Sequence, residues 1–155
     1  MIVRFLTFVC RLIFEIQGWK IEGPIPHELK KYVVIVAPHT SAWDVPIGVA
    51  ARSILGLNIK FLAKDELFQF PWEKMMLQIG AIPVNRQNPH NLVDRLVMKY
   101  QEENEFKLGL SPEGTREKVS KWRSGFYHLA LKAEIPIICV GLDYKSRSIV
   151  IRAPY

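Results

Sequence analysis

The sequence has few cysteines: only Cys10 and Cys139 occur among its 155 residues, and they share no CxxC spacing. Both lie in apolar surroundings, and two distant cysteines do not make the disulfide framework of a small secreted domain. We therefore expect a reducing compartment in which both thiols are buried and inert. Because Cys139 falls inside an apolar strand pattern, we interpret it as a core residue and not as a nucleophile.

The sequence also lacks the motifs that carry several common chemistries. It has no GxSxG nucleophile elbow, no Walker A loop and no GxGxxG dinucleotide fingerprint. His27, His90 and His128 have no cluster of Cys, Asp or Glu at ligand spacing around them. The sequence therefore predicts no metal site and no bound cofactor.

A long uninterrupted hydrophobic run is missing as well. Met1–Ile16 is mostly apolar but contains Arg4, Arg11 and Glu15. A central arginine costs about 2.5–3.5 kcal/mol on the insertion scale, whereas each large apolar residue gains only about 0.3–0.6 kcal/mol, so a spanning helix is marginal. The polar residues share one helical face, which predicts an amphipathic helix over residues 1–17 that lies in a membrane interface. The alternative is a helix packed on the core, and no small-x-small site indicates a signal peptide.

What the chain has in excess is positive charge. Its net charge of +6 and isoelectric point near 9.4 favour an anionic partner, such as nucleic acid, an acidic membrane surface or a phosphorylated small molecule. The aromatic residues lie inside apolar runs and do not decide among these. Because 49% of the residues are hydrophobic and 23% are charged, the chain is typical of a globular protein, and its length suits one domain, here residues 18–155.

Short apolar runs alternate with amphipathic segments along this domain. Tyr32–Ala37 is a continuous apolar run ended by Pro38, which is typical of a buried parallel strand. The pattern predicts further strands and helices, and a turn or short edge strand at Gly18–Gly23. The strands are Lys60–Ala63, Ala81–Val84, Lys107–Leu110, Ile135–Val140 and Ser148–Arg152, and the helices are Trp43–Leu55, Pro71–Gln78, Pro89–Gln101 and Phe126–Ala133. This alternation predicts a single α/β domain with a largely parallel central sheet flanked by helices. The chain stops at Tyr155, three residues after the last predicted strand, which suggests a C-terminally short domain.

The most informative residues follow the predicted strands. Ligands of open α/β sheets bind at the carboxyl ends of strands, and His39, Arg86 and the segment Ser111–Arg116 all occupy such positions. Because His39 ends a strand and Asp44 begins a helix, a sharp turn can bring the carboxylate to the imidazole. A carboxylate on Nδ1 fixes the tautomer and favours the imidazolium that forms when Nε2 accepts a proton. The alternative is that Asp44 or Ser41 caps the helix and His39 is an ordinary turn residue.

The second of these segments has the composition of an anion site. Gly114 lets successive backbone N–H groups converge, Thr115 adds a hydroxyl, and Arg116 can bind phosphate through two hydrogen bonds. Glu113 is placed to hold that guanidinium or its neighbours. Arg86 can supply a second phosphate contact. A solvated loop and a surface arginine are the alternatives.

Four segments, in order, resemble the glycerophospholipid acyltransferases, the family typified by bacterial 1-acylglycerol-3-phosphate acyltransferase. His39–Asp44 matches the His-x4-Asp block, and Gly80–Arg86 matches the second block, which ends in arginine. Ser111–Arg116 resembles the third block, Phe-Pro-Glu-Gly-Thr-Arg, and Ile135–Val140 resembles the fourth. The resemblance runs from about residue 18 to residue 140, and four ordered blocks make chance a poor explanation.

The resemblance implies a site and an activity. His39 is then the general base and Asp44 its partner, and the glycerophosphate site consists of Arg86, Glu113, Gly114, Thr115 and Arg116. The implied reaction of phospholipid biosynthesis moves a fatty acyl group from acyl-CoA or acyl carrier protein to the hydroxyl of a lysophospholipid, above all 1-acylglycerol-3-phosphate. The thioester is a co-substrate and not a cofactor. We expect a peripheral or monotopic protein at the cytoplasmic face of the membrane, with the membrane surface as partner and no nucleic acid.

The chain departs from the family pattern at four positions. Ser111 replaces the usual Phe, Asn85 the common Asp, Pro83 an aromatic residue and Cys139 a proline. These changes leave the implied base and phosphate-binding residues in place. Because the second and third blocks contact the acceptor in the family, the acceptor stays open: one alternative is a lyso-lipid without glycerophosphate, such as an aminoacyl lipid. A non-catalytic lipid- or anion-binding protein is the other.

Overall fold

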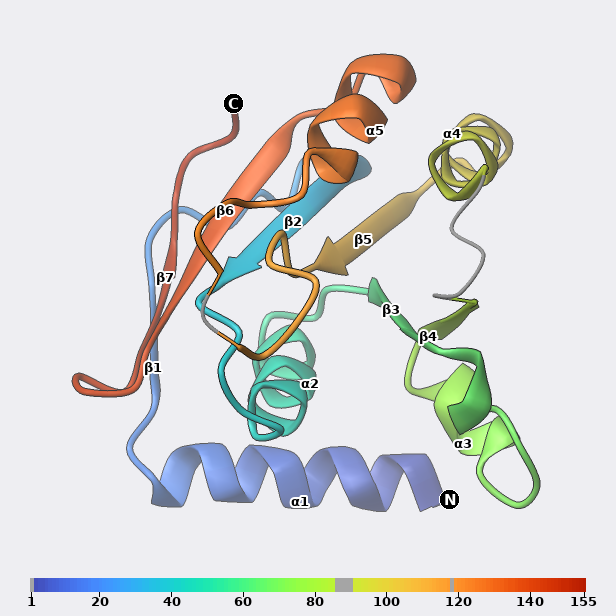
Figure 1. Ribbon diagram of the computed structural model, residues 1–155. Coiled ribbons are helices and arrows are strands. Elements are labelled where there is room, and N and C mark those ends of the chain that lie inside the picture. The colour runs from blue at the N-terminus through green and yellow to red at the C-terminus, as the bar shows by residue number, and fades with distance from the viewer. Residues whose placement is uncertain (1, 86–90, 118) are drawn as a thin grey trace.

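The computed structural model describes residues 2–85, 91–117 and 119–155, and Figure 1 shows a central sheet with helices on both faces. The sheet has seven strands in the order β1-β7-β6-β2-β5-β3-β4. Their bounds are β1 Lys20–Glu22, β2 Lys31–Ala37, β3 Ile59–Lys64, β4 Ala81–Val84, β5 Phe106–Leu110, β6 Ile137–Asp143 and β7 Ser148–Ile151. Strand β7 runs antiparallel to β6, and the other neighbouring strands are parallel. The predicted single α/β domain with a largely parallel sheet is confirmed.

The helices form the outer layers. Helices α1 and α2 cover one face of the sheet, and α4 and α5 cover the other (Figure 1). The helices are α1 Ile2–Ile16, α2 Asp44–Ile54, α3 Glu73–Gln78, α4 Leu92–Glu102 and α5 Gly125–Ala133, and a short 3₁₀ turn, η1, covers Asp65–Leu67. The turn η1 was not predicted. Residues 89–90 of the predicted helix Pro89–Gln101 lie outside the described residues.

Strand β2 lies in the middle of the sheet, and this position accounts for its apolar sequence. Successive side chains of a strand point to opposite faces. Val33 accordingly packs with Leu108 and Leu129 on the side of α4 and α5, whereas Val34 packs with Ala50 on the side of α1 and α2. Both faces of this strand are therefore buried, which is why its sequence is continuously apolar.

Strand β6 begins later and ends later than the sequence pattern predicts. Ile135 lies just after α5, and its N–H donates back to the carbonyl of Ala130, which closes the end of that helix. Pro136 has no N–H, and its carbonyl accepts a hydrogen bond from Val33 at 3.1 Å. The strand therefore starts at Ile137 and continues through Gly141 to Asp143.

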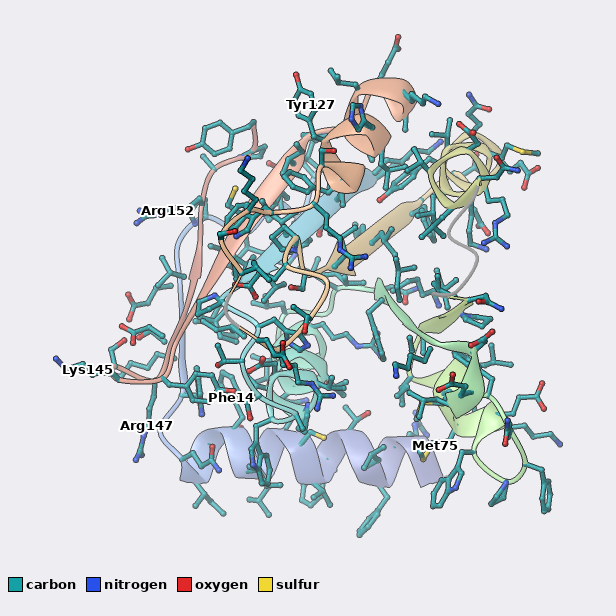
Figure 2. The ribbon with its side chains drawn as sticks, viewed as in Figure 1. Phe14, Met75, Tyr127, Lys145, Arg147 and Arg152 are labelled. Atoms are coloured by element: carbon teal, nitrogen blue, oxygen red, sulfur yellow. The ribbon has the colours of Figure 1, made fainter. Side chains whose placement is uncertain are left out.

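Helix α1 has two apolar sides. Cys10 and Phe14 are buried against the body of the protein, and Figure 2 shows Phe14 on that side of the helix. Phe5, Phe8 and Ile16 are 68%, 60% and 75% exposed. Among the described residues, no helix is both long and apolar enough to cross a bilayer. Both cysteines are unpaired: Cys10 is buried as expected, but Cys139 is only half-buried.

Truncation of Leu108 to Ala tests the two-sided core. Leu108 is fully buried in β5, and buried Leu→Ala changes typically lower the free energy of unfolding by about 2–5 kcal/mol. The control is Leu131→Ala in α5, where the side chain is 59% exposed and we expect a change within about 0.5 kcal/mol. Urea denaturation of both variants measures the difference, and equal stabilities would contradict this description of the core.

Candidate functional site

His39 and Asp44 meet in the turn between β2 and α2. His39 Nδ1 lies 2.7 Å from Asp44 Oδ2, and the two side chains are 25% and 4% exposed. Since a carboxylate only accepts hydrogen bonds, Nδ1 is the donor of this pair, and in the neutral imidazole Nε2 then carries the lone pair. Trp43 precedes α2 and makes no side-chain cap. The turn thus places Asp44 on the imidazole, as the sharp-turn hypothesis requires. The capping alternative holds beside it, because Ser41 Oγ accepts the backbone N–H of Trp43 at 3.1 Å at the start of α2.

Asp44 has further partners on both carboxylate oxygens. Its Oδ2 also accepts the backbone N–H of Ser41 at 3.1 Å. Its Oδ1 accepts the hydroxyl of Tyr144, which lies in the turn between β6 and β7. A buried carboxylate is costly unless it is hydrogen-bonded, and here each oxygen has a donor. The orientation of the imidazole is therefore defined by groups from two separate loops.

Glu113 connects the second loop to the first. Its Oε2 accepts the backbone N–H of His39 at 2.7 Å, whereas the sequence suggested that it holds the guanidinium of Arg116 or its neighbours. The connection follows from the register, because β2 and β5 are parallel and Ile35 pairs with Leu110. The carboxyl ends of these strands meet, as expected for an open α/β sheet. Glu113 thus fixes the position of the loop relative to His39.

Gly114 lies in a turn, with a φ of +67°, but its amide is not among the N–H groups that the sequence expected to converge on an anion. Its N–H donates to the carbonyl of Ser111 at 3.2 Å, so this amide closes the turn. A Cβ on Gly114 would lie 2.8 Å from Nε of Arg123, whose guanidinium covers the glycine. Both the backbone and the close approach require glycine here.

The remaining predicted residues are distributed around this loop. Thr115 Oγ1 accepts the N–H of Glu117 at 3.3 Å, and Arg116 is exposed. Arg86 lies outside the described residues, so its predicted phosphate contact stays a prediction. Within the described ranges, no three His, Cys, Asp or Glu side chains are grouped to hold a metal ion.

Two residues of this region were missed by sequence reasoning, Tyr144 and Arg123. Tyr144 follows β6, which is parallel to β2, with Ala37 opposite Gly141. His39 was selected because it follows the carboxyl end of a strand. Tyr144 would have been selected for the same reason if the predicted strand Ile135–Val140 had extended to Asp143. Arg123 offers a cation beside Gly114, but its place nine positions after that glycine gives no local signal.

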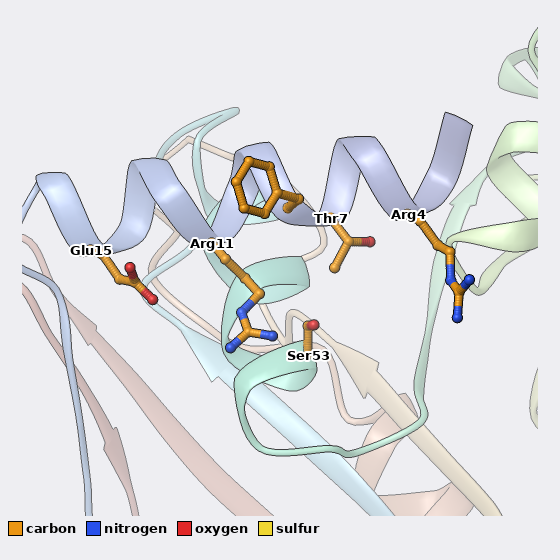
Figure 3. A pocket seen from close by; sticks show the side chains of 6 residues that line it. Arg4, Thr7, Arg11, Glu15 and Ser53 are labelled. Atoms are coloured by element: carbon orange, nitrogen blue, oxygen red, sulfur yellow. The ribbon is translucent and has the colours of Figure 1, made fainter. Parts of the chain in front are cut away.

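A separate hollow lies between α1 and α2, away from the dyad. It has a volume of about 570 Å³ and is lined by Arg4, Thr7, Phe8, Arg11, Glu15 and Ser53. Figure 3 shows Arg4, Thr7 and Arg11 on the same side of α1, directed toward the region of Ser53 in α2. The polar face that the sequence predicted for this helix therefore lines the hollow.

Comparison with known proteins establishes the class. The Acyltransferase family matches residues 19–143, which include the dyad and the Gly114 loop. The chain belongs to this family. It is 39% identical over 85 residues to a 1-acyl-sn-glycerol-3-phosphate acyltransferase of Bacillus subtilis, covering 54% of this chain and 41% of that protein. It is 29% identical over 147 residues to the protein of that name from Streptococcus pneumoniae, covering 88% and 53%.

A solved structure shares the fold. The crystal structure of the 1-acyl-sn-glycerophosphate acyltransferase from Thermotoga maritima superposes with a TM-score of 0.67 at 18% sequence identity, and the match covers 99% of this chain and 68% of that one. The chain spans about half the length of the curated relatives that it matches.

Substitution of Gly114 by Ala tests the loop. Because the new Cβ meets Arg123 and an L-residue is strained at this φ, we expect the free energy of unfolding to fall by about 1–3 kcal/mol. Gly125→Ala is the matched control, since a Cβ there meets nothing within 4 Å. Urea denaturation compares the two, and a Gly114→Ala variant as stable as the control would contradict the described turn.

Proposed function

We propose that the chain is an O-acyltransferase that moves a fatty acyl group from a thioester to the hydroxyl of a lysophospholipid. The proposed acceptor is 1-acylglycerol-3-phosphate, and the proposed donor is acyl-CoA or acyl carrier protein. Support comes from family membership and from the names of the relatives. The observation that carries the proposal is the 2.7 Å contact between His39 and Asp44 at the carboxyl edge of the sheet.

The geometry suits a general base. The acceptor hydroxyl donates to Nε2 of His39, and its oxygen attacks the carbonyl carbon of the thioester while the proton moves to Nε2. Asp44 stabilises the imidazolium that forms. When the tetrahedral intermediate collapses, the C–S bond breaks and the imidazolium returns the proton to the thiolate. The acyl group passes directly between the substrates, without an acyl-enzyme.

The Gly114 loop supplies the anchor for the acceptor in this proposal. Arg116 and Arg123 bring guanidinium groups to the loop that Glu113 ties to His39, and guanidinium binds phosphate through paired hydrogen bonds. A phosphate held there positions the nearby hydroxyl on Nε2, which is the main benefit of binding to the rate. Arg86 is proposed as a further contact.

We also propose that α1 lies in the membrane interface. The helix presents Phe5, Phe8, Leu12 and Ile16 to solvent, and α3 lies beside its N-terminal half (Figure 1). Four large apolar side chains in and before α3 are exposed as well: Leu67, Phe70, Trp72 and Leu77. Exposed large apolar side chains on neighbouring elements support membrane docking as the use of this side of the protein.

Charge beside this surface supports an anionic bilayer. Arg4 and Arg11 line the hollow next to Phe8 (Figure 3), and basic side chains at the height of the headgroups attract acidic lipids. The net charge of +6 acts in the same direction. Two unpaired cysteines suit a reducing compartment, so we propose the cytoplasmic face of the membrane.

His39→Ala tests the enzymatic proposal. Loss of a general base lowers rates by about 10²–10⁴-fold, and we expect this fall in acyl transfer to 1-acylglycerol-3-phosphate, measured by mass spectrometry with long-chain acyl-CoA and acyl carrier protein donors. The control is His27→Ala, an exposed histidine before β2, which should retain the wild-type rate.

The panel of acceptors separates the alternatives. Product from a lyso-lipid without phosphate, and not from 1-acylglycerol-3-phosphate, would keep the base and discard the phosphate anchor. Unchanged transfer by His39→Ala, or no transfer by folded wild type to any acceptor, would contradict the enzymatic proposal.

Replacement of Phe5 and Phe8 by Ser tests membrane docking. Both rings are exposed in the protein alone, so the fold should persist. Burying one Phe contributes roughly 1.5–3 kcal/mol, and we expect at least about tenfold weaker sedimentation with vesicles of phosphatidylglycerol and phosphatidylcholine. The control is Leu131→Ser, an exposed position on the opposite face of the sheet.

A second variant in this assay separates charge from apolar contact. Arg4→Gln combined with Arg11→Gln should weaken binding to the anionic vesicles while leaving the weaker binding to phosphatidylcholine alone unchanged. Equal binding by wild type and the Phe5 and Phe8 double variant would rule out docking through this side of α1.

A further inference from the structure

Tyr144 contacts the dyad without belonging to the part of the chain that defines the family. It lies one position beyond the matched residues 19–143, in the turn between β6 and β7. Its hydroxyl donates to Oδ1 of Asp44, while Oδ2 of the same carboxylate receives His39 and the N–H of Ser41. No local sequence pattern assigns this role to Tyr144, because 100 positions separate it from Asp44.

We propose that Tyr144 is a positioning residue for the base. Its hydroxyl holds the Asp44 carboxylate in the plane that keeps Nδ1 of His39 engaged and Nε2 directed at the acceptor hydroxyl. This inference rests on the proposed function, because it assigns Tyr144 a part in the same proton transfer. Tyr144 acts through Asp44 and is not itself a proton carrier.

The argument begins with the freedom of a carboxylate. A carboxylate bound through only one oxygen can rotate about the Cβ–Cγ bond, and the imidazole on that oxygen then loses its fixed direction. The donor on Oδ1 removes this freedom, since both oxygens are hydrogen-bonded to different parts of the chain. Asp44 is almost fully buried, so water is a poor substitute for the hydroxyl.

The ring of Tyr144 is itself held in place. It packs edge-on against Trp19, with centroids 5.1 Å apart. Trp19 is buried and stacks on Phe14 of α1 at 6.2 Å. The turn that carries the ring is closed by Asp143, whose Oδ1 accepts the N–H of Lys145 at 2.9 Å. The hydroxyl is therefore presented to Asp44 by a ring that packs on Trp19, is 39% exposed, and stands on a hydrogen-bonded turn.

The hydroxyl also remains a donor at working pH. Burial, followed by the hydrogen bond to Asp44 and its charge, raises the pKa of Tyr144 to about 12. A phenol with this pKa keeps its proton throughout the neutral range. The charged and titratable groups around His39 in this arrangement are Asp44 from α2, Glu113 from the β5–α5 loop and Tyr144 itself.

Tyr144→Phe removes the hydroxyl and keeps the ring, so the packing on Trp19 is retained. We expect kcat for acyl transfer to fall on the order of tenfold, as for the loss of one hydrogen bond to a charged group. KM for the acceptor should stay within about twofold, because Tyr144 touches Asp44 and not the acceptor. The matched control is Tyr155→Phe, which removes a hydroxyl from a ring that is 82% exposed and should leave both constants unchanged.

A double-mutant cycle and a spectroscopic signal make the assignment specific. In the background of Asp44→Asn, adding Tyr144→Phe should cause little further loss, because the two residues act through one contact. The Nδ1 proton of His39, bonded to a carboxylate, should give a downfield proton NMR signal that is absent from His39→Ala. We expect Tyr144→Phe to shift or broaden this signal and Tyr155→Phe to leave it in place.

These readouts separate the inference from the proposed function. Wild type without any transfer activity would defeat the proposed function, while the NMR signal would still decide whether Tyr144 positions the dyad. An unchanged signal in Tyr144→Phe overturns the inference. So does a full additive loss in the Asp44→Asn background, or a parallel change of kcat and KM together with a lower Tm, which would indicate a merely structural hydroxyl.

Discussion

The geometry of this protein depends on one buried carboxylate, that of Asp44. An ionised carboxylate out of water is tolerated only when hydrogen bonds replace its hydration. The donors come from the imidazole of His39, the backbone of Ser41 and the hydroxyl of Tyr144. Because α2 begins at Asp44, the same interaction connects the end of β2, the start of α2 and the β6–β7 turn. A change in any of these alters the direction of Nε2.

A second carboxylate extends this arrangement to the other loop. Glu113 accepts the backbone N–H of His39, so the loop with the guanidinium groups is attached to the base through the main chain and not through the imidazole. The attachment requires that the ends of β2 and β5 be neighbours, which the parallel register provides. In the proposed function, the sheet would thereby determine the distance between the acceptor's phosphate and Nε2.

Much of the fold followed from local pattern, and the failures have a common physical cause. The β2 run was recognised because burial on both faces leaves a continuous apolar signature. His39, Asp44 and Gly114 were recognised because a turn or a block of neighbours surrounds them. The interactions of Glu113 and Tyr144 were not, because they join residues 74 and 100 positions apart. Such pairs depend on strand order and register, and no periodicity within a segment encodes either.

Helix α1 also shows what a local sequence pattern leaves undecided. Its sequence left two interpretations open, an interface helix or a helix packed on the core, because one hydrophobic pattern served both. The structure divides the apolar residues between two sides: Cys10 and Phe14 face the core, and Phe5, Phe8 and Ile16 face solvent. The packing on the core is therefore shown, and the interface helix stays a prediction that this packing does not contradict.

The position of α1 has a consequence for the proposed chemistry. Phe14 contacts Trp19, Trp19 contacts Tyr144, and the hydroxyl of Tyr144 is bonded to Asp44. Packed rings transmit position because protein interiors are dense and yield little to small displacements. If α1 docks on a bilayer through its outer side, as proposed, its inner side would set the height of the dyad above the lipid. An acceptor whose acyl chain stays in the membrane presents its hydroxyl at a nearly constant height. His39, positioned by this series of rings and not by a free loop, is therefore suited to accept the proton of that hydroxyl in the proposed reaction.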